Sequence, residues 1–223
     1  MFLHSYPVIL NRYNINHAIS SIYSKQNHTV MKRLFTLPLF AVLISILFSS
    51  CGYNTMVSQQ EAVDGAWAQV DVQYQRRNDL IGNLVETVKG YAKFEQETLT
   101  KVVEARASAT QVKVDATQLT EANIEKYQAA QGQLTSALSK LLSITENYPD
   151  LKANQGFADL RIELSGTENR IAVARKNFNE AVQSYNTLIR TFPNNMFAGM
   201  YGFEKKGYFK AEAGSDKAPQ VKF

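Results

Sequence analysis

Histidine and cysteine are almost absent from this 223-residue chain. The three histidines, His4, His17 and His28, lie near the N-terminus, and Cys51 is the only cysteine. Neither residue type therefore occurs in residues 52–223. Nucleophilic triads need an imidazole as general base, and zinc sites rely mainly on His and Cys. We accordingly expect no metal site, no cofactor and no catalytic residue in this part of the chain.

Nucleotide-binding and hydrolase motifs are also missing, because the sequence contains no P-loop, no GxGxxG and no GxSxG. The net charge of +4 comes from residues 1–51, which hold four of the 24 basic residues and no acidic one. Residues 52–223 therefore carry 20 basic and 20 acidic residues, mixed along the chain without a basic stripe. This pattern argues against nucleic-acid binding. An enzyme that uses carboxylates alone is the alternative left open, although Asp64, Asp71 and Asp79 are interpreted first as a solvated helix face.

A typical export signal follows Met31, in the sequence "MKRLFTLPLFAVLISILFSSCG". Two basic residues precede an apolar run over 34–48, and small residues come next. The run is short for a bilayer-spanning helix, which needs about 20 residues. The pattern predicts a signal peptide over residues 31–50. Residues 1–30 precede a complete signal, so we interpret them as an upstream extension or a mis-assigned start; a genuine cytoplasmic extension is the competing hypothesis.

Cys51 stands immediately after Ser49 and Ser50, an arrangement that resembles a bacterial lipobox. In such signals the cysteine is acylated through its sulfur, for example with palmitate, and becomes the new N-terminus. We therefore predict lipidation at Cys51, a short linker over 51–56, and a lipid-anchored protein on a bacterial membrane that faces the periplasm or the exterior. Phe48 departs from the leucine that is usual three residues before the cysteine. The alternative is an uncleaved signal anchor with an incidental cysteine.

Apolar residues after Cys51 recur at alternating steps of four and three, and strand-like alternation is nowhere sustained. This period predicts helices over 57–109, 120–147 and 154–192, with Thr120 as an N-cap. The expected fold is all-α: an antiparallel, up-down-up bundle of three long helices with coiled-coil-like packing. The first helix would be much longer than the second, so either it breaks near Gly82 or Gly90 and makes four helices, or part of it packs on another subunit. We favour a straight or gently kinked helix.

Several large or polar residues on these stripes are candidate contacts, either for setting the register of the bundle or for binding a partner. The candidates are Trp67, Tyr74, Arg77, Thr167, Glu168, Asn169 and Arg170. Buried polar groups must be paired. We therefore favour the structural role over a recognition surface.

A second candidate group is the aromatic stretch after Pro193. It contains Phe197, Tyr201, Phe203, Tyr208 and Phe209. In an up-down-up bundle this patch would lie at the distal end, near the loop around 110–120. Capping the open core is the favoured role, and docking a partner is the alternative. Residues 210–223 are predicted to be a disordered tail.

Two long strings carry a family resemblance. They are "YNTMVSQQEAVDGAWAQVDVQYQRRNDLIGNLVETVKGYAKFEQETL" and "ENYPDLKANQGFADLRIELSGTENRIAVARKNFNEAVQSYNTLIRTFP". In their order, they resemble the LemA family from Tyr53 to Phe209, with the bundle assigned to 57–209. The resemblance implies a membrane-anchored helical bundle facing away from the cytoplasm, with no established enzymatic activity and with a TPM-domain envelope protein as a partner. Gly82 replaces a proline common in the family, and many members keep a transmembrane helix.

These observations favour a lipid-anchored scaffold or adaptor that projects helices from a bacterial membrane. The alternative hypothesis is an envelope enzyme, or enzyme subunit, that uses carboxylates only. The expected contacts are the membrane through Cys51, the TPM-domain protein and further copies of the chain, without nucleic acid.

Overall fold

Helices form nearly all of the computed structural model, which describes residues 52–90 and 95–211. The first helix covers residues 52–89. It is followed by α2 (Gln96–Gln111), α3 (Glu121–Thr145), the single turn α4 (Pro149–Lys152) and α5 (Gln155–Arg190), with short 3₁₀ turns η1 (Ala116–Gln118) and η2 (Asn194–Met196). The described residues contain no strand, so the predicted all-α class is confirmed.

The chain divides into two units, Met1–Asn54 and Thr55–Phe223, and the helices α2 to α5 belong to the second. The predicted signal peptide, Cys51 and the upstream extension fall outside the described residues, as do residues 212–223 of the predicted tail. Within the described ranges, no helix combines the length and the apolar character that crossing a bilayer requires.

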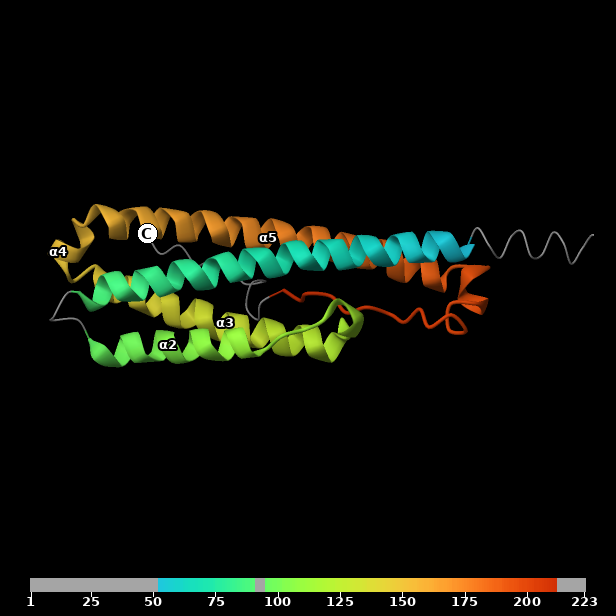
Figure 1. The fold of residues 1–223 in the computed structure, drawn as a ribbon, viewed down its shortest axis with the longest axis horizontal. Coiled ribbons are helices and arrows are strands. Elements are labelled where there is room, and N and C mark those ends of the chain that lie inside the picture. The colour runs from blue at the N-terminus through green and yellow to red at the C-terminus, as the bar shows by residue number, and fades with distance from the viewer. Residues whose placement is uncertain (1–51, 91–94, 212–223) are drawn as a thin grey trace, which may run out of the picture. The chain divides into compact units, whose positions relative to one another are not determined.

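The long helices of the second unit alternate in direction, as Figure 1 shows. The first helix and α5 run antiparallel and side by side, while α2 and α3 form a shorter pair against them. At 1.5 Å per residue the first helix is about 57 Å long and α2 only about 24 Å. The helix α2 therefore covers only one half of the first helix.

The prediction of one helix over 57–109 is wrong, because the first helix ends at residue 89 and α2 begins at Gln96. The break follows Gly90, which lies in a turn, whereas Gly82 is helical. A Cβ added at Gly82 would lie 3.1 Å from Nη2 of Arg106 in α2. Gly82 therefore lies against the guanidinium of Arg106 and does not end the first helix.

The predicted ends of α3 and α5 agree with the structure to within two residues, whereas the first helix begins at residue 52 and not at 57. Thr120 caps α3, since its hydroxyl accepts a hydrogen bond from the backbone nitrogen of Asn123 at 3.3 Å. Asn154 caps α5 in the same way, by accepting from the backbone nitrogen of Phe157 at 2.9 Å. Both caps satisfy a donor that the first turn of a helix leaves without a partner.

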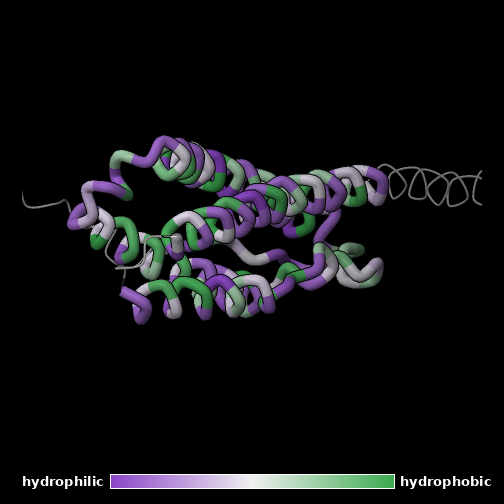
Figure 2. The backbone as a smooth tube through the Cα atoms, turned by 60° about the vertical axis from the view of Figure 1, so that its left-hand side comes forward, coloured by the Kyte–Doolittle hydropathy of each residue, from purple (hydrophilic) through white to green (hydrophobic). Residues whose placement is uncertain are grey.

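The apolar side chains form two separate clusters, and Figure 2 shows hydrophobic positions recurring along each helix. The aliphatic cluster lies where four helices meet: Ile81, Leu84, Val85, Val88, Leu99, Val102, Ala109, Leu134, Leu138, Leu141, Leu151, Phe157 and Leu164. The aromatic cluster lies toward the start of the first helix: Met56, Val63, Trp67, Val70, Tyr74, Leu119, Ile124, Tyr127, Ile171, Ala174, Phe178, Val182, Tyr185, Ile189, Ala198, Phe203 and Phe209.

The C-terminal segment (residues 203–211) completes the aromatic half of the bundle, where α2 does not reach. It turns back after α5 and is drawn in red in Figure 1. Asn186 of α5 donates to the carbonyl of Lys206 and accepts from its backbone nitrogen, both at 2.9 Å. Asn179 makes the same pair of bonds with Phe209, again at 2.9 Å. Two side-chain amides of α5 thus hold this extended segment through its backbone.

The other side of the C-terminal segment contacts α3 and the loop before it. The amide of Gln128 bonds the backbone of Lys210 in both directions, at 2.8 and 3.1 Å. Gly207 donates its backbone N–H to the carbonyl of Leu119 at 2.8 Å. A Cβ at Gly207 would lie 2.7 Å from the Cα of Glu121. Glycine is therefore needed at this position because the two backbones touch.

Candidate functional site: the polar layer around Arg77

Arg77 of the first helix lies between the aliphatic cluster and the aromatic cluster. It occupies a stripe position of the helix and is only 2% exposed, which is exceptional for an arginine. Its position follows from the helical period, since Tyr74 and Ile81 on either side of it are also buried. The sequence therefore forces a full positive charge into the interior of the bundle.

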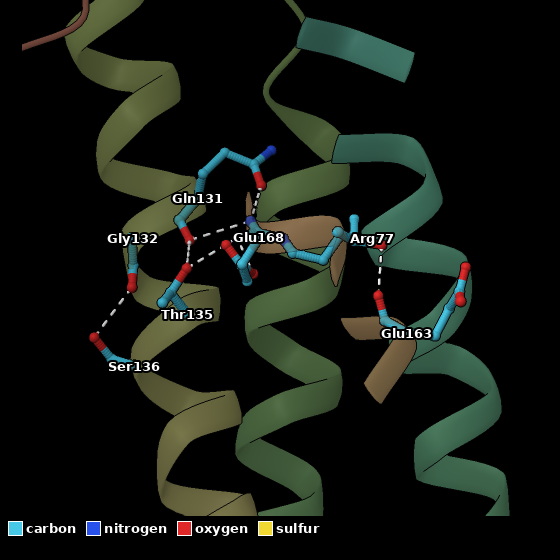
Figure 3. Close-up of polar contacts among 8 residues, drawn as sticks. Arg77, Gln131, Gly132, Thr135, Ser136, Glu163 and Glu168 are labelled. Carbon is cyan, nitrogen blue, oxygen red and sulfur yellow. Dashed lines mark hydrogen bonds and ion pairs between the residues drawn. The ribbon is translucent and has the colours of Figure 1, made fainter. Parts of the chain in front are cut away.

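The guanidinium of Arg77 is hydrogen-bonded to side chains from two other helices, which point toward it in Figure 3. Its Nη1 donates to Oγ1 of Thr135 at 2.9 Å and to Oε1 of Glu168 at 3.1 Å. Its Nη2 donates to the carbonyl of Gln131 at 3.4 Å and also to the side-chain Oε1 of the same residue. The first helix, α3 and α5 are thereby joined at one level. We call these four residues, with Thr167 and Glu163 beside them, the Arg77 layer.

The outer part of the Arg77 layer lies on α5. Thr167 is fully buried; its hydroxyl donates to the carbonyl of Glu163 at 2.8 Å and accepts from Nη2 of Arg170 at 3.1 Å. The carboxylate of Glu163 pairs with Arg76 and lies 3.6 Å from Arg170. The hydrogen bond from Arg76 lowers the pKa of Glu163, so this carboxylate stays ionised. The layer therefore extends from the interior to the surface.

The chemistry of this layer is charge pairing. Glu168 is partly exposed and its carboxylate accepts from Arg77, so the charge of the buried guanidinium is compensated. The ring of Tyr74 also lies 4.9 Å from the guanidinium carbon and adds a cation–π contact. A buried charge with fixed partners on two helices has one favourable register, because sliding a helix would leave it unpaired.

Of the seven candidate contacts, the structure brings Tyr74, Arg77, Thr167, Glu168 and Arg170 together. Trp67 lies elsewhere, in the aromatic cluster. Its indole donates to the carbonyl of Val114 at 3.0 Å, and its ring contacts other aromatic rings of the cluster. The seventh, Asn169, lies with Arg170 on a surface hollow of about 360 Å³ between the first helix and α5.

The aromatic stretch after Pro193 lies at the end where the first helix begins, and not at the opposite end as expected. The reason is the break near Gly90, since a fourth helix reverses the direction of α5. Phe203 and Phe209 are buried in the aromatic cluster, Phe197 and Tyr208 are half-buried, and Tyr201 is half exposed. The aromatic stretch was also expected to lie near the 110–120 loop. A hydrogen bond from Nζ of Lys206 to the carbonyl of Ala116 at 3.1 Å confirms that closeness.

Sequence reasoning assigned no role to Gln131 and Thr135, which are the α3 partners of Arg77. A signal was present, because Gln131 interrupts an otherwise apolar stripe and is only 4% exposed. A polar residue at such a position requires a buried partner. Arg77 is the complementary group on the first helix.

A polar pocket of about 340 Å³ beside the Arg77 layer also had no counterpart in the sequence analysis. Residues of the first helix, the end of α2, the 112–115 loop and α3 line it, Asp71 and Tyr127 among them. The hydroxyl of Tyr127 lies 3.5 Å from Oδ1 of Asp71. Burial, together with the charge of Asp71, raises the pKa of Tyr127 well above its ordinary value. In the described part of the chain, no group of three or more His, Cys, Asp and Glu residues is placed to bind a metal ion.

Comparison with known proteins finds relatives that match more than four fifths of this chain. It is 27% identical over 185 residues to Protein LemA of Metamycoplasma hominis, covering 82% of this chain and 81% of that one. It is 24% identical over 200 residues to Magnetosome protein MamQ 1 of Paramagnetospirillum magneticum (82% of this chain, 74% of that one). It is also 24% identical over 212 residues to Magnetosome protein MamQ of Magnetospirillum gryphiswaldense (86% and 77%).

The sequence signature of the LemA family matches residues 66–223, which is more than half of the chain. This range includes every member of the Arg77 layer and of both apolar clusters except Met56 and Val63. The chain belongs to the LemA family.

Proposed function

We propose that this protein is a lipid-anchored, non-catalytic helical scaffold or adaptor of the bacterial envelope. The observation that carries the proposal is the Arg77 layer. Its charged and polar groups are used to hold three helices in register, as expected for a structural element. Family membership supports the same broad class.

The anchor in this proposal is Cys51, which follows the apolar run over 34–48. Acylation of its sulfur would attach the bundle to the membrane, with the helices on the periplasmic or outer side. One acyl chain alone gives marginal, reversible membrane binding, so a stable anchor needs a second acyl chain or another membrane contact.

The anchor is tested by Cys51→Ser in cells fed a labelled fatty acid. We expect loss of label and accumulation of the unprocessed precursor. Ser50→Ala serves as the matched control, because it keeps a small residue before the cysteine and should be labelled normally. Normal labelling of Cys51→Ser would disprove lipidation at this residue.

The partner in this proposal is an envelope protein with a TPM domain, by analogy with the family, and further copies of the chain are the second candidate. Photo-crosslinkers at exposed positions of α5, such as Ile162 and Val173, test this in native membranes. A crosslink to the TPM-domain protein supports the adaptor role. Crosslinks only between copies of this chain would instead favour a homo-oligomeric scaffold.

The polar pocket gives a second candidate function, a carboxylate-only enzyme. Asp71 lines the pocket beside Tyr127, whereas the carboxylate of Glu168 is bound to Arg77. Hydrolase activity of purified protein that is lost in Asp71→Asn, but kept in Asp79→Asn, would favour this function. Loss in Glu168→Gln as well would implicate the Arg77 layer in the chemistry and overturn the scaffold proposal.

A further inference from the structure

Exposed apolar side chains are concentrated on the turn that follows α5, which we call the terminal turn (residues 191–202). Nine large apolar side chains are exposed among the described residues, and four of them lie on this turn. Phe192 is 75% exposed, Met196 61% and Met200 79%, and Tyr201 is the fourth. Single exposed apolar residues are normal on protein surfaces, but a local group of this kind marks a contact surface.

The backbone of the terminal turn is held firmly against the aromatic cluster. Ala198 is 4% exposed and packs in that cluster. Its carbonyl accepts from the backbone nitrogen of Phe203 at 2.9 Å, and its own nitrogen donates to the carbonyl of Asn194 at 2.9 Å. The inner side of the turn is therefore fixed, while Phe192, Met196 and Met200 on its outer side are exposed.

The terminal turn lies at the end of the bundle where the first helix begins. Met56, one turn into that helix, belongs to the same aromatic cluster as Ile189 and Ala198, and Figure 1 shows both segments at one end. Only the three residues 52–54 separate Cys51 from this unit. Three residues span at most about 11 Å even when fully extended, so a bundle anchored through Cys51 keeps this end close to the bilayer.

We propose that the terminal turn inserts Phe192, Met196 and Met200 into the surface of the anchoring bilayer. The inference rests on the membrane anchoring proposed above. The lipid on Cys51 and the turn then contact the bilayer together, so this end of the bundle is held at two places. Because the anchor keeps the turn near the bilayer, a weak apolar contact is enough to orient the bundle.

The composition of the terminal turn favours lipid over a protein partner. Residues 191–202 contain no Asp, Glu, Lys or Arg, so inserting them into the interface buries no charge. Phenylalanine, methionine and tyrosine are suited to the boundary between headgroups and acyl chains. The turn also lacks the charged residues that usually set specificity against another protein.

The test uses tryptophan reporters in the full lipidated chain, reconstituted into phosphatidylcholine vesicles with or without brominated acyl chains. The protein has a single, buried tryptophan, Trp67, which gives a constant background. Phe192→Trp and Met200→Trp place reporters on the terminal turn. Ile162→Trp is the matched control, because Ile162 is 72% exposed on α5 and about 42 Å from the end of that helix that leads into the terminal turn.

We expect brominated lipid to quench the Phe192→Trp and Met200→Trp reporters about twofold more than Ile162→Trp, since an interfacial apolar surface reaches only ~5–10 Å into the bilayer. Replacing both Met196 and Met200 with serine should abolish the extra quenching of Phe192→Trp. Equal quenching of all reporters in protein that floats with the vesicles would overturn the inference and leave the anchor intact. Failure to float would overturn both.

A second copy of the chain is the competing occupant of the terminal turn. It would give a dimer by sedimentation in detergent solution, without vesicles. That result would overturn the inference. A monomer under the same conditions supports it.

Discussion

The two halves of the bundle bury their apolar side chains by different means. The half that contains α2 is a four-helix bundle with a largely aliphatic core, in which Leu134 and Leu141 are fully buried. The other half lacks α2, and its core is rich in aromatic rings such as Trp67 and Phe178. There the C-terminal segment, an extended chain, takes the place of the missing helix.

This difference shows what is needed to close a bundle whose helices differ in length. An extended segment cannot satisfy its own backbone as a helix does. Side-chain amides from α5 and α3 therefore bond its N–H and C=O groups, while large rings fill the wider space between the helices. The Arg77 layer lies at the junction between the aliphatic half and the aromatic half of the bundle.

The largest effect is expected from removing a ring in the aromatic half. Phe178 is fully buried, with its centroid 5.4 Å from Trp67 and 5.5 Å from Phe209. Phe178→Ala should cost about 4 kcal/mol of unfolding free energy, and Leu134→Ala in the aliphatic half about 3 kcal/mol. Urea unfolding measures both. Amide exchange should be faster in residues 203–211 only for Phe178→Ala, and equal exchange in both variants would contradict this division.

The next largest effect is expected at the junction of the halves. Arg77→Ala should cost about 3 kcal/mol, because it removes a buried charge from its partners on α3 and α5. Arg76→Ala is the matched control; this neighbour is about half exposed and pairs with Glu163, so we expect a cost of about 1 kcal/mol or less.

Arg77→Met sharpens the same comparison. Replacing a buried charge by an apolar side chain of similar length is often nearly neutral for stability. We expect this variant to unfold at a urea concentration close to that of the wild type, while spin-label distances between the first helix and α3 become broader. Unchanged distance distributions would show that the Arg77 layer does not set the register.

A smaller effect is expected from the amides that hold the C-terminal segment. Asn186 is 4% exposed, so Asn186→Ala leaves two buried backbone groups of Lys206 without partners and should cost about 2 kcal/mol. Gln128→Ala removes the equivalent exposed pair, and water can replace it at a lower cost. If Asn186→Ala and Gln128→Ala lose equal stability in thermal unfolding, burial does not determine how much these amide–backbone hydrogen bonds contribute to stability.

The smallest effects are expected from pH, with opposite signs at two carboxyl groups of the aromatic half. Burial raises the pKa of Asp64 above its ordinary 3.8, against the charge of Lys206. The contribution of Asp64 to the free energy of unfolding is therefore complete when the pH is below its ordinary pKa. It is lost as the pH rises through the raised pKa of Asp64 in the folded protein. Asp64→Asn should be more stable than the wild type at neutral pH.

Glu121 behaves in the opposite way. A hydrogen bond from Lys210, 3.0 Å away, lowers the pKa of Glu121 below its ordinary 4.5. The contribution of Glu121 to the free energy of unfolding is present above pH 4.5. It is lost as the pH falls through the lowered pKa of Glu121 in the folded protein. Urea unfolding of Glu121→Gln and Asp64→Asn across the acidic range should give pH profiles that differ from the wild type in opposite directions. Profiles that shift in the same direction would contradict the assignment.

The sequence predicted the buried faces of the helices well, because packing requires a regular apolar period. Val63, Val70 and Ile81 are all fully buried as expected. A break near Gly90 was weighed only as the alternative to one straight helix, because one long helix and two shorter ones produce the same apolar stripe. A signal existed in charge: Lys89 precedes the glycine and Glu97 lies in the first turn of α2, the arrangement that helix dipoles favour at an end and a start.

The partners of the Arg77 layer were partly predictable, but the amides that hold the C-terminal segment were not. Arg77 and Gln131 interrupt apolar stripes, which marks them as buried and paired. Asn179 and Asn186 bond backbone groups that any residue supplies, 20 or more positions away. Such a contact leaves no pattern in the partner sequence, so only the folded structure reveals it.

The even number of long helices has a consequence for how this architecture can change in size. The chain enters the Thr55–Phe223 unit and turns back after α5 at one end, while the opposite end of the described residues holds the turn at Gly90 and α4. Adding seven residues to each helix that reaches those connections would move the opposite end outward by about 10.5 Å. The aromatic cluster and the terminal turn would stay as they are. The length of the bundle can therefore change without altering the end that carries the aromatic cluster and the terminal turn, so the two features can evolve independently.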